Sequence, residues 1–213
     1  MNPLLQEVKK LLQDASFSWA VCGGFGLELF LNAEIRTHGD IDICVFERNR
    51  ETILRHMLER DWEVYEFRGM GKVRPIRDAQ ASEPGRNVLC LKEGCELIRF
   101  YPCDEQDQYH QFFHTGIREL NYVEFLFNRA ENGAFVFDPG KEIRKNLTEV
   151  IRFREGIPYL APEVALLYKA SRWEEEQNRL DFERVYPCME ENQQNWLMRS
   201  LETLYPQGHP WIL

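Results

Sequence analysis

The sequence lacks the features of a membrane or secreted protein. No apolar run approaches the roughly 20 residues that a bilayer-spanning helix needs. Residues 1–10 have neither the basic start nor the apolar core of a secretion signal. The six cysteines include no Cys-x-x-Cys pair, the spacing typical of zinc sites and redox motifs. We therefore expect a cytoplasmic protein with reduced thiols, without a disulfide framework or structural zinc.

Positive charge is also scarce. The 213 residues include 26 Lys and Arg against 35 Asp and Glu, which gives a net charge of −9. Proteins that hold nucleic acid need clustered basic residues to neutralise its phosphates, so this balance argues against a nucleic-acid partner. It suits a neutral or cationic small molecule, and a bound nucleotide would need local basic groups or a metal ion.

Two adjacent glycines follow an apolar segment near the N-terminus. Residues 17–22 are predicted to form a strand, Gly23 and Gly24 a turn, and residues 25–32 an amphipathic helix. A Gly-Gly turn that opens a helix lets the backbone approach a ligand closely and directs free N–H groups toward an anion. The pattern therefore predicts an anion-binding turn.

Asp40 and Asp42 occupy alternate positions of the next predicted strand, residues 40–46. Alternate side chains of a strand point the same way, so we expect these two carboxylates side by side. Mg²⁺ prefers carboxylate oxygens together with substrate phosphates. An edge strand with its polar side facing solvent would show the same Asp-x-Asp pattern, but the glycine turn and helix upstream favour a metal site.

A third carboxylate, Glu124, interrupts the apolar run of residues 121–127. A charge buried in a strand is costly unless it is paired or bound to metal, and a strand beside the Asp strand would provide that partner. Glu96 is the rival for this position. The structural alternative is that Glu124 lies on the solvent-facing side of an edge strand.

The middle of the chain contains a basic segment and a hairpin pattern. Residues 68–86 carry five basic side chains among Gly and Pro, which predicts an exposed loop that could reach donor phosphates. Residues 87–91 and 95–101 flank a Lys-Glu-Gly turn, so we expect them to pair with each other as a hairpin.

The glycine turn followed by His38-x-Asp-Ile-Asp42 resembles the nucleotidyltransferase superfamily of DNA polymerase β, and most closely its aminoglycoside and lincosamide nucleotidyltransferases. Residues 156–170 and the ending, residues 208–213, are similar to downstream segments of bacterial members. Where relatives continue with Lys-Asp-x-x-Asp-Phe, this chain has Gln-Asn-Arg-Leu-Asp181-Phe, so only the last acidic residue is retained.

The resemblance implies an α/β (α+β) fold of the polymerase β-like type, with a small mixed sheet flanked by helices and a C-terminal helical part. We expect a catalytic domain over residues 1–150. Residues 151–213 would form the helical region that closes the cleft.

The resemblance also implies roles for particular residues. Asp40 and Asp42 would bind Mg²⁺, and Glu124 would complete the metal site or take the proton of the acceptor hydroxyl. The residues implied to hold the nucleotide are Gly23, Gly24, His38 and Lys169. As isolated features, His38 reads equally well as an exposed loop residue, and Lys169 as a surface lysine lying along its helix.

The implied activity is transfer of a nucleoside monophosphate, AMP from ATP, to a hydroxyl of a small acceptor similar to aminoglycosides or lincosamides, with release of pyrophosphate. Two alternatives stay open: a toxin-type enzyme that modifies a protein or tRNA, and a relative that binds nucleotide without turnover. A homodimer that completes the acceptor pocket is also compatible with so short a chain.

Overall fold

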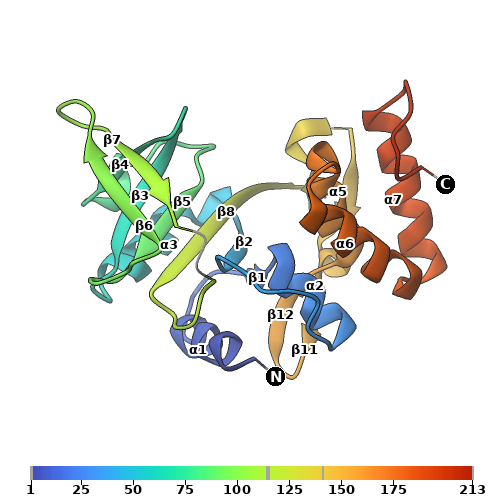
Figure 1. Cartoon of the computed structure of the whole chain (residues 1–213), viewed down its shortest axis with the longest axis horizontal. Helices are drawn as coiled ribbons and strands as arrows, with labels where there is room; N and C mark the ends of the chain where they lie inside the picture. Colours follow the sequence, from blue (N-terminus) through green and yellow to red (C-terminus); the bar gives the residue numbers. More distant parts are fainter. Residues whose placement is uncertain (1, 114–115, 141, 213) are drawn as a thin grey trace. The chain divides into compact units, whose positions relative to one another are not determined.

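The computed structural model describes residues 2–113, 116–140 and 142–212 (Figure 1). Contacts divide the chain into two units, residues 1–19 with 37–128 and residues 20–36 with 129–213. The domain boundary near residue 150 that the sequence predicts stays a prediction.

The first unit is built on a mixed sheet with the strand order β2-β8-β5-β3-β4-β7-β6. Its strands are β2 (Asp42–Phe46), β3 (Glu63–Gly69), β4 (Lys72–Ile76), β5 (Val88–Leu91), β6 (Ile98–Pro102), β7 (Gln108–Phe112) and most of β8 (Tyr122–Glu131). Its helices are α1 (Pro3–Leu12) and α3 (Arg50–Leu58), with short 3₁₀ segments at Glu47–Asn49 and Ala79–Ala81. The β2–β8 pair is parallel, and the other pairs of this sheet are antiparallel.

The hairpin expected over residues 87–101 is not formed. β5 pairs with β3 and β8, whereas β6 pairs with β7. The prediction was wrong because a Lys-Glu-Gly turn fixes only the local change of direction. β5 instead lies between β3 and β8, where all four of its residues are buried.

The basic segment is also not an exposed loop. It contains the end of β3 and all of β4, and its arginines surround a buried carboxylate, Glu66, which is 0% exposed. The carboxylate of Glu66 accepts four hydrogen bonds. The donors are Arg68 Nη1 at 3.2 Å, Arg74 Nη2 at 2.9 Å, Ser82 Oγ at 2.7 Å and the backbone N–H of Glu83 at 2.6 Å. Two of the five basic residues, Arg68 and Arg74, therefore pair with a carboxylate of their own unit.

The second unit packs helices on two small strand pairings. Its helices are α2 (Gly23–Leu31), α4 (Leu147–Val150), α5 (Pro162–Lys169), α6 (Glu176–Val185) and α7 (Glu191–Leu204), with 3₁₀ segments at Asp138–Gly140, Ala170–Arg172 and Tyr186–Cys188. Its strands are β9 (Ala134–Val136), β10 (Arg144–Asn146), β11 (Ile151–Arg154) and β12 (Ile157–Leu160), and β1 (Trp19–Val21) begins at the unit boundary. β12 pairs with β11 and, through Tyr159 opposite Val21, with β1. Within the described ranges, no helix is long and apolar enough to cross a membrane.

Helix α2 packs against α5, α6 and β12. Its close approach to β1 depends on Gly26, where an added Cβ would lie 2.8 Å from the carbonyl oxygen of Val21. We expect Gly26→Ala to lower the free energy of unfolding by about 1–3 kcal/mol, because the clash is with backbone that cannot move aside cheaply. Urea denaturation measures this, and Gly39→Ala is the control because a Cβ there meets nothing within 4 Å. Equal stability of the two variants would contradict the packing described.

The cysteines differ in accessibility. Cys22, Cys44 and Cys90 are buried, whereas Cys188 is exposed. Burial raises the pKa of Cys44 to about 12 and raises the pKa of Cys90 as well, and a protonated thiol is a poor nucleophile. We expect a thiol reagent at pH 8 to modify Cys188 first and the three buried cysteines only after unfolding, as peptide mass mapping would show. Fast labelling of Cys90 in the native protein would contradict this packing.

Candidate active site

The parallel pairing of β2 with β8 brings two carboxylates together. In the register of this pair, Asp42 lies opposite Glu124, and the backbone N–H of Glu124 donates to the carbonyl of Ile41 at 2.9 Å. Val123 and Phe125, on either side of Glu124, are 0% exposed. Because side chains alternate along a strand, burial of these neighbours directs Glu124 to the other face.

Asp40 lies just before the strand rather than in it. β2 begins at Asp42, and Asp40 is exposed. The sequence predicts both aspartates in one strand, whereas in the structure only Asp42 is in the strand and Asp40 is in the loop before it. Its carboxylate nevertheless acts on Glu124, since it contributes to the raised pKa of that residue. Asp40, Asp42 and Glu124 therefore belong to one cluster.

Tyr122 is a fourth member of this cluster. Its side chain is 1% exposed, and its hydroxyl donates a hydrogen bond to Oε1 of Glu124. Burial raises the pKa of Glu124 to about 7; the hydrogen bond from Tyr122 opposes this shift, and the charge of Asp40 adds to it. Burial, Glu124, Asp40 and Asp42 all raise the pKa of Tyr122 well above its usual value. Sequence reasoning missed this residue, although a tyrosine two positions before a strand carboxylate shares its face.

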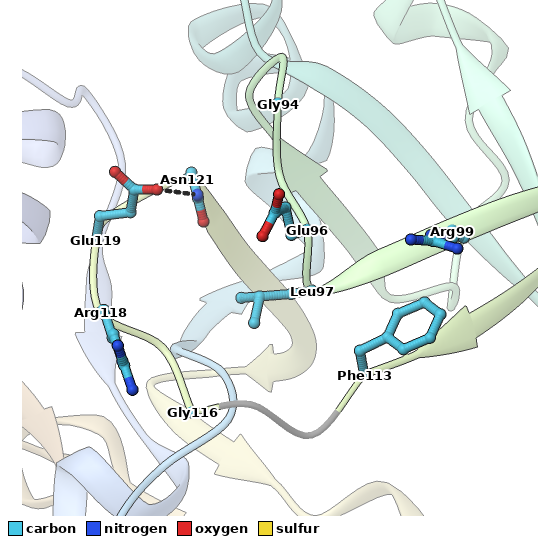
Figure 2. Close-up of a pocket in the computed structure, with 9 residues that line it drawn as sticks. All are labelled: Gly94, Glu96, Leu97, Arg99, Phe113, Gly116, Arg118, Glu119 and Asn121. Atoms are coloured by element: carbon cyan, nitrogen blue, oxygen red, sulfur yellow. Dashed lines mark hydrogen bonds between the residues drawn. The ribbon is translucent and has the colours of Figure 1, made fainter.

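Glu96, the rival third carboxylate, lies elsewhere in the first unit. It lines an open pocket of about 750 Å³ with Gly94, Leu97, Arg99, Phe113, Gly116, Arg118, Glu119 and Asn121 (Figure 2). In Figure 2 the amide of Asn121 donates to Glu119 at 2.9 Å, and the guanidinium of Arg99 lies 5.0 Å from the ring centre of Phe113. Glu124, opposite Asp42, is the better placed of the two candidates.

His38 is buried, with 5% of its surface exposed. Its carbonyl accepts the N–H of Ile117 at 2.9 Å, and this bond ties the loop before Asp40 to the segment that leads into β8. The alternative of an exposed loop histidine is therefore wrong. The same segment, residues 116–121, lines part of the pocket.

The predicted nucleotide-binding residues of the second unit lie on two elements. Gly23 and Gly24 begin α2, where Gly23 has a φ of 58°, in the left-handed region that glycine adopts readily. Cys22, at the N-cap, makes no side-chain capping bond. The start of α2 therefore has the uncapped geometry that an anion can occupy.

Lys169 is the last residue of α5, and it is not a surface lysine. Its Nζ lies 2.9 Å from Oδ2 of Asp181 and 3.2 Å from Oδ1 of Asn178, both on α6. Asp181 is 0% exposed, and its carboxylate also accepts hydrogen bonds from Nε and Nη2 of Arg36, at 3.2 and 3.3 Å. Asp181, the retained acidic residue of the downstream pattern, thus joins two cations.

The described residues contain no group of three or more His, Cys, Asp or Glu side chains already arranged to hold a metal ion. Mg²⁺ does not need such a cage, because it is usually held by one or two carboxylates, water and substrate phosphates. The like charges of Asp40 and Asp42 at the end of β2 fit a cation of this kind.

Residues 4–89 match the model of the aminoglycoside-2''-adenylyltransferase family. Over this segment, about two fifths of its length, the chain is similar to a family of nucleotidyltransferases. The matched segment includes Gly23, Gly24, His38, Asp40 and Asp42, and it ends before β8. The resemblance inferred from the sequence is confirmed.

One solved structure shows a similar fold. The lincomycin-bound crystal structure of the lincosamide antibiotic adenylyltransferase LnuA superimposes with a TM-score of 0.54 at 11% identity, over 89% of this chain and 98% of that chain. Two structures of ANT(2'')-Ia, a crystal structure with adenylyl-2''-tobramycin and a solution structure, give TM-scores of 0.49 and 0.48 at 9% identity. They cover 92% and 96% of this chain, and 94% and 92% of theirs. No curated protein matches the sequence significantly. The predicted polymerase β-like α/β fold is confirmed.

The carboxylate cluster should weaken the metal-free fold. Like charges opposite each other in a sheet destabilise it, so we expect Asp42→Asn to raise the free energy of unfolding by roughly 0.2–1 kcal/mol in the presence of EDTA. Excess Mg²⁺ should stabilise the native chain more than the variant. Urea denaturation with and without Mg²⁺ measures both effects. Glu105→Gln, an exposed change in the same unit, should show neither.

Proposed function

We propose that the protein transfers a nucleoside monophosphate from a nucleoside triphosphate to a hydroxyl of a small acceptor, with release of pyrophosphate. The observation that carries this proposal is the register of β2 with β8, which sets Glu124 opposite Asp42. The match to an adenylyltransferase family supports ATP as the donor and an aminoglycoside-like or lincosamide-like compound as the acceptor.

Asp40 and Asp42 would hold Mg²⁺, with Glu124 as a third carboxylate. When bound, Mg²⁺ would neutralise charge on the phosphates and on the attacking oxygen. The protein's own contribution is then mostly to position groups and to stabilise charge, as is general in phosphoryl and nucleotidyl transfer.

In the proposed reaction the acceptor hydroxyl oxygen bonds to the α-phosphorus, and the bond from that phosphorus to the oxygen bridging to the β-phosphorus breaks. Pyrophosphate leaves with that oxygen. Glu124 completes the carboxylate set or receives the hydroxyl proton, and the bond from Tyr122 holds its Oε1.

The remaining predicted residues would serve the donor. Backbone N–H groups at Gly23 and Gly24, together with the ammonium of Lys169, would bind the phosphates. His38, buried just before Asp40, would orient a carboxylate or a phosphate.

The pocket of the first unit supports a small acceptor. Its volume of about 750 Å³ lies within the range of small-molecule sites. Two acidic and two basic side chains line it, so it offers partners to a polar acceptor without favouring one sign of charge. A macromolecular acceptor such as tRNA finds less support, because the net charge is −9. Cytoplasmic location and dimerisation stay predictions.

The test is pyrophosphate release from ATP and Mg²⁺ with a panel of aminoglycosides and lincosamides, with the adenylylated product identified by mass. We expect Asp40→Asn and Asp42→Asn each to lower the rate at least about 100-fold, because each removes a carboxylate that offsets charge in the transition state. Glu105→Gln should keep the native rate. The proposal fails if no acceptor supports pyrophosphate release and ATP binding is indifferent to Mg²⁺ and to both carboxylates.

A further inference from the structure

We propose that Asp181 is a positioning residue for the donor triphosphate, and that it acts by fixing the ammonium of Lys169. The inference rests on the proposed function, from which it takes the triphosphate role of Lys169. It adds that Asp181 holds the ammonium of Lys169 in position to bind phosphate. It also adds Arg36 as a second cation that pairs with the same carboxylate.

The first support is the geometry of the Lys169 ammonium. Two acceptors on α6, Oδ1 of Asn178 and Oδ2 of Asp181, lie 3.2 and 2.9 Å from Nζ. They are three residues apart on one helix and therefore share a face. A lysine that only covers apolar surface extends its ammonium to water, whereas this ammonium is drawn to a defined point and its side chain is 15% exposed.

The second support is that both acceptors are themselves fixed. Asn178 is 3% exposed, and its Nδ2 donates to the carbonyl of Arg172 at 2.9 Å and to Oε2 of Glu175 at 3.1 Å. These bonds leave Oδ1 of Asn178 as the end that faces Lys169. The side chain of Asp181 is fully buried, and Arg36 fixes its other oxygen through Nε at 3.2 Å.

Arg36 is held from its backbone as well. Glu28 on α2 is 7% exposed, and its Oε1 accepts the N–H of Ile35 at 2.7 Å and that of Arg36 at 3.3 Å. The buried carboxylate of Asp181 therefore joins three segments: the chain after α2, the end of α5, and α6. The two cations, whose side chains are mostly buried, are therefore held in place in the absence of any ligand.

Pre-arrangement lowers the cost of binding. A lysine has several rotatable bonds, and immobilising such a side chain when a ligand binds weakens affinity by about two- to tenfold. If Asp181 already immobilises Lys169 in the folded chain, replacing Asp181 should weaken phosphate binding. Simple long-range charge predicts the opposite, because removing a carboxylate makes the unit more attractive to an anion. The two explanations therefore differ in the sign of the effect.

The experiment is calorimetry of inorganic tripolyphosphate without metal on the full chain, at low salt. We expect Lys169→Gln to weaken binding about tenfold and Asp181→Asn to weaken it about three- to tenfold. Glu183→Gln is the matched control, because it removes an exposed carboxylate from the same helix and should leave binding unchanged or slightly tighter.

A double-mutant cycle separates positioning from a structural role. If Asp181 acts through Lys169, the double variant should bind tripolyphosphate no more weakly than Lys169→Gln alone. Arg36→Gln should also weaken binding, and circular dichroism melting checks that each variant is folded. Additive losses in the cycle, or binding unchanged in a folded Asp181→Asn variant, would overturn the proposal. Glu183→Gln measures how much the loss of any exposed carboxylate on α6 changes tripolyphosphate binding.

Failure of this inference can be told from failure of the proposed function. Tripolyphosphate binding needs neither Mg²⁺ nor an acceptor, whereas pyrophosphate release needs both. A chain that releases pyrophosphate but binds tripolyphosphate equally well in every variant would keep the function and lose the role of Asp181. A chain that binds tripolyphosphate through Lys169 and Asp181 but never turns over would keep the cluster and lose the function.

Discussion

The parallel pairing of β2 with β8 is the constraint on which the candidate catalytic cluster depends. Some eighty residues separate the two strands along the chain, and their register alone sets Glu124 opposite Asp42. A slip by one residue would turn Glu124 to the opposite face and place an apolar neighbour there. Burial of Val123 and Phe125 resists that slip, so the apolar core fixes the chemistry of the polar face.

Four carboxylates that are buried or partly buried fall into two kinds according to their partners. Glu66, Glu163 and Asp181 are each 0% exposed and each meets at least one cation: arginines for Glu66, Lys145 for Glu163, and Lys169 with Arg36 for Asp181. Glu124 instead accepts a hydrogen bond from the neutral hydroxyl of Tyr122, and burial together with the charge of Asp40 raises its pKa. Pairing with cations is what buried acids need for stability, whereas clustering of like charges is typical of sites that bind a cation.

The clustering of basic residues along the sequence did not predict which of them pair with carboxylates in the folded chain. The arginines of residues 68–86 are close in sequence and seemed available to phosphates, yet Glu66 and Glu83 pair with Arg68 and Arg74 in the folded chain. The two cations that we propose for the donor phosphates, Lys169 and Arg36, are 133 residues apart and form no cluster in the sequence. Local charge density is thus a poor guide to where positive charge acts.

The sequence by itself determined the local patterns: the glycine turn before α2, the aspartates around the start of β2, a carboxylate in an apolar strand, and the proline that starts α5. These depend on backbone preference and on side-chain period, which act over a few residues. Only the tertiary structure decided that β5 leaves its expected hairpin partner, that Tyr122 holds Glu124, and that Asp181 joins Lys169 to Arg36. Such contacts join residues whose proximity results from the packing of the whole chain, and no short-range preference encodes it.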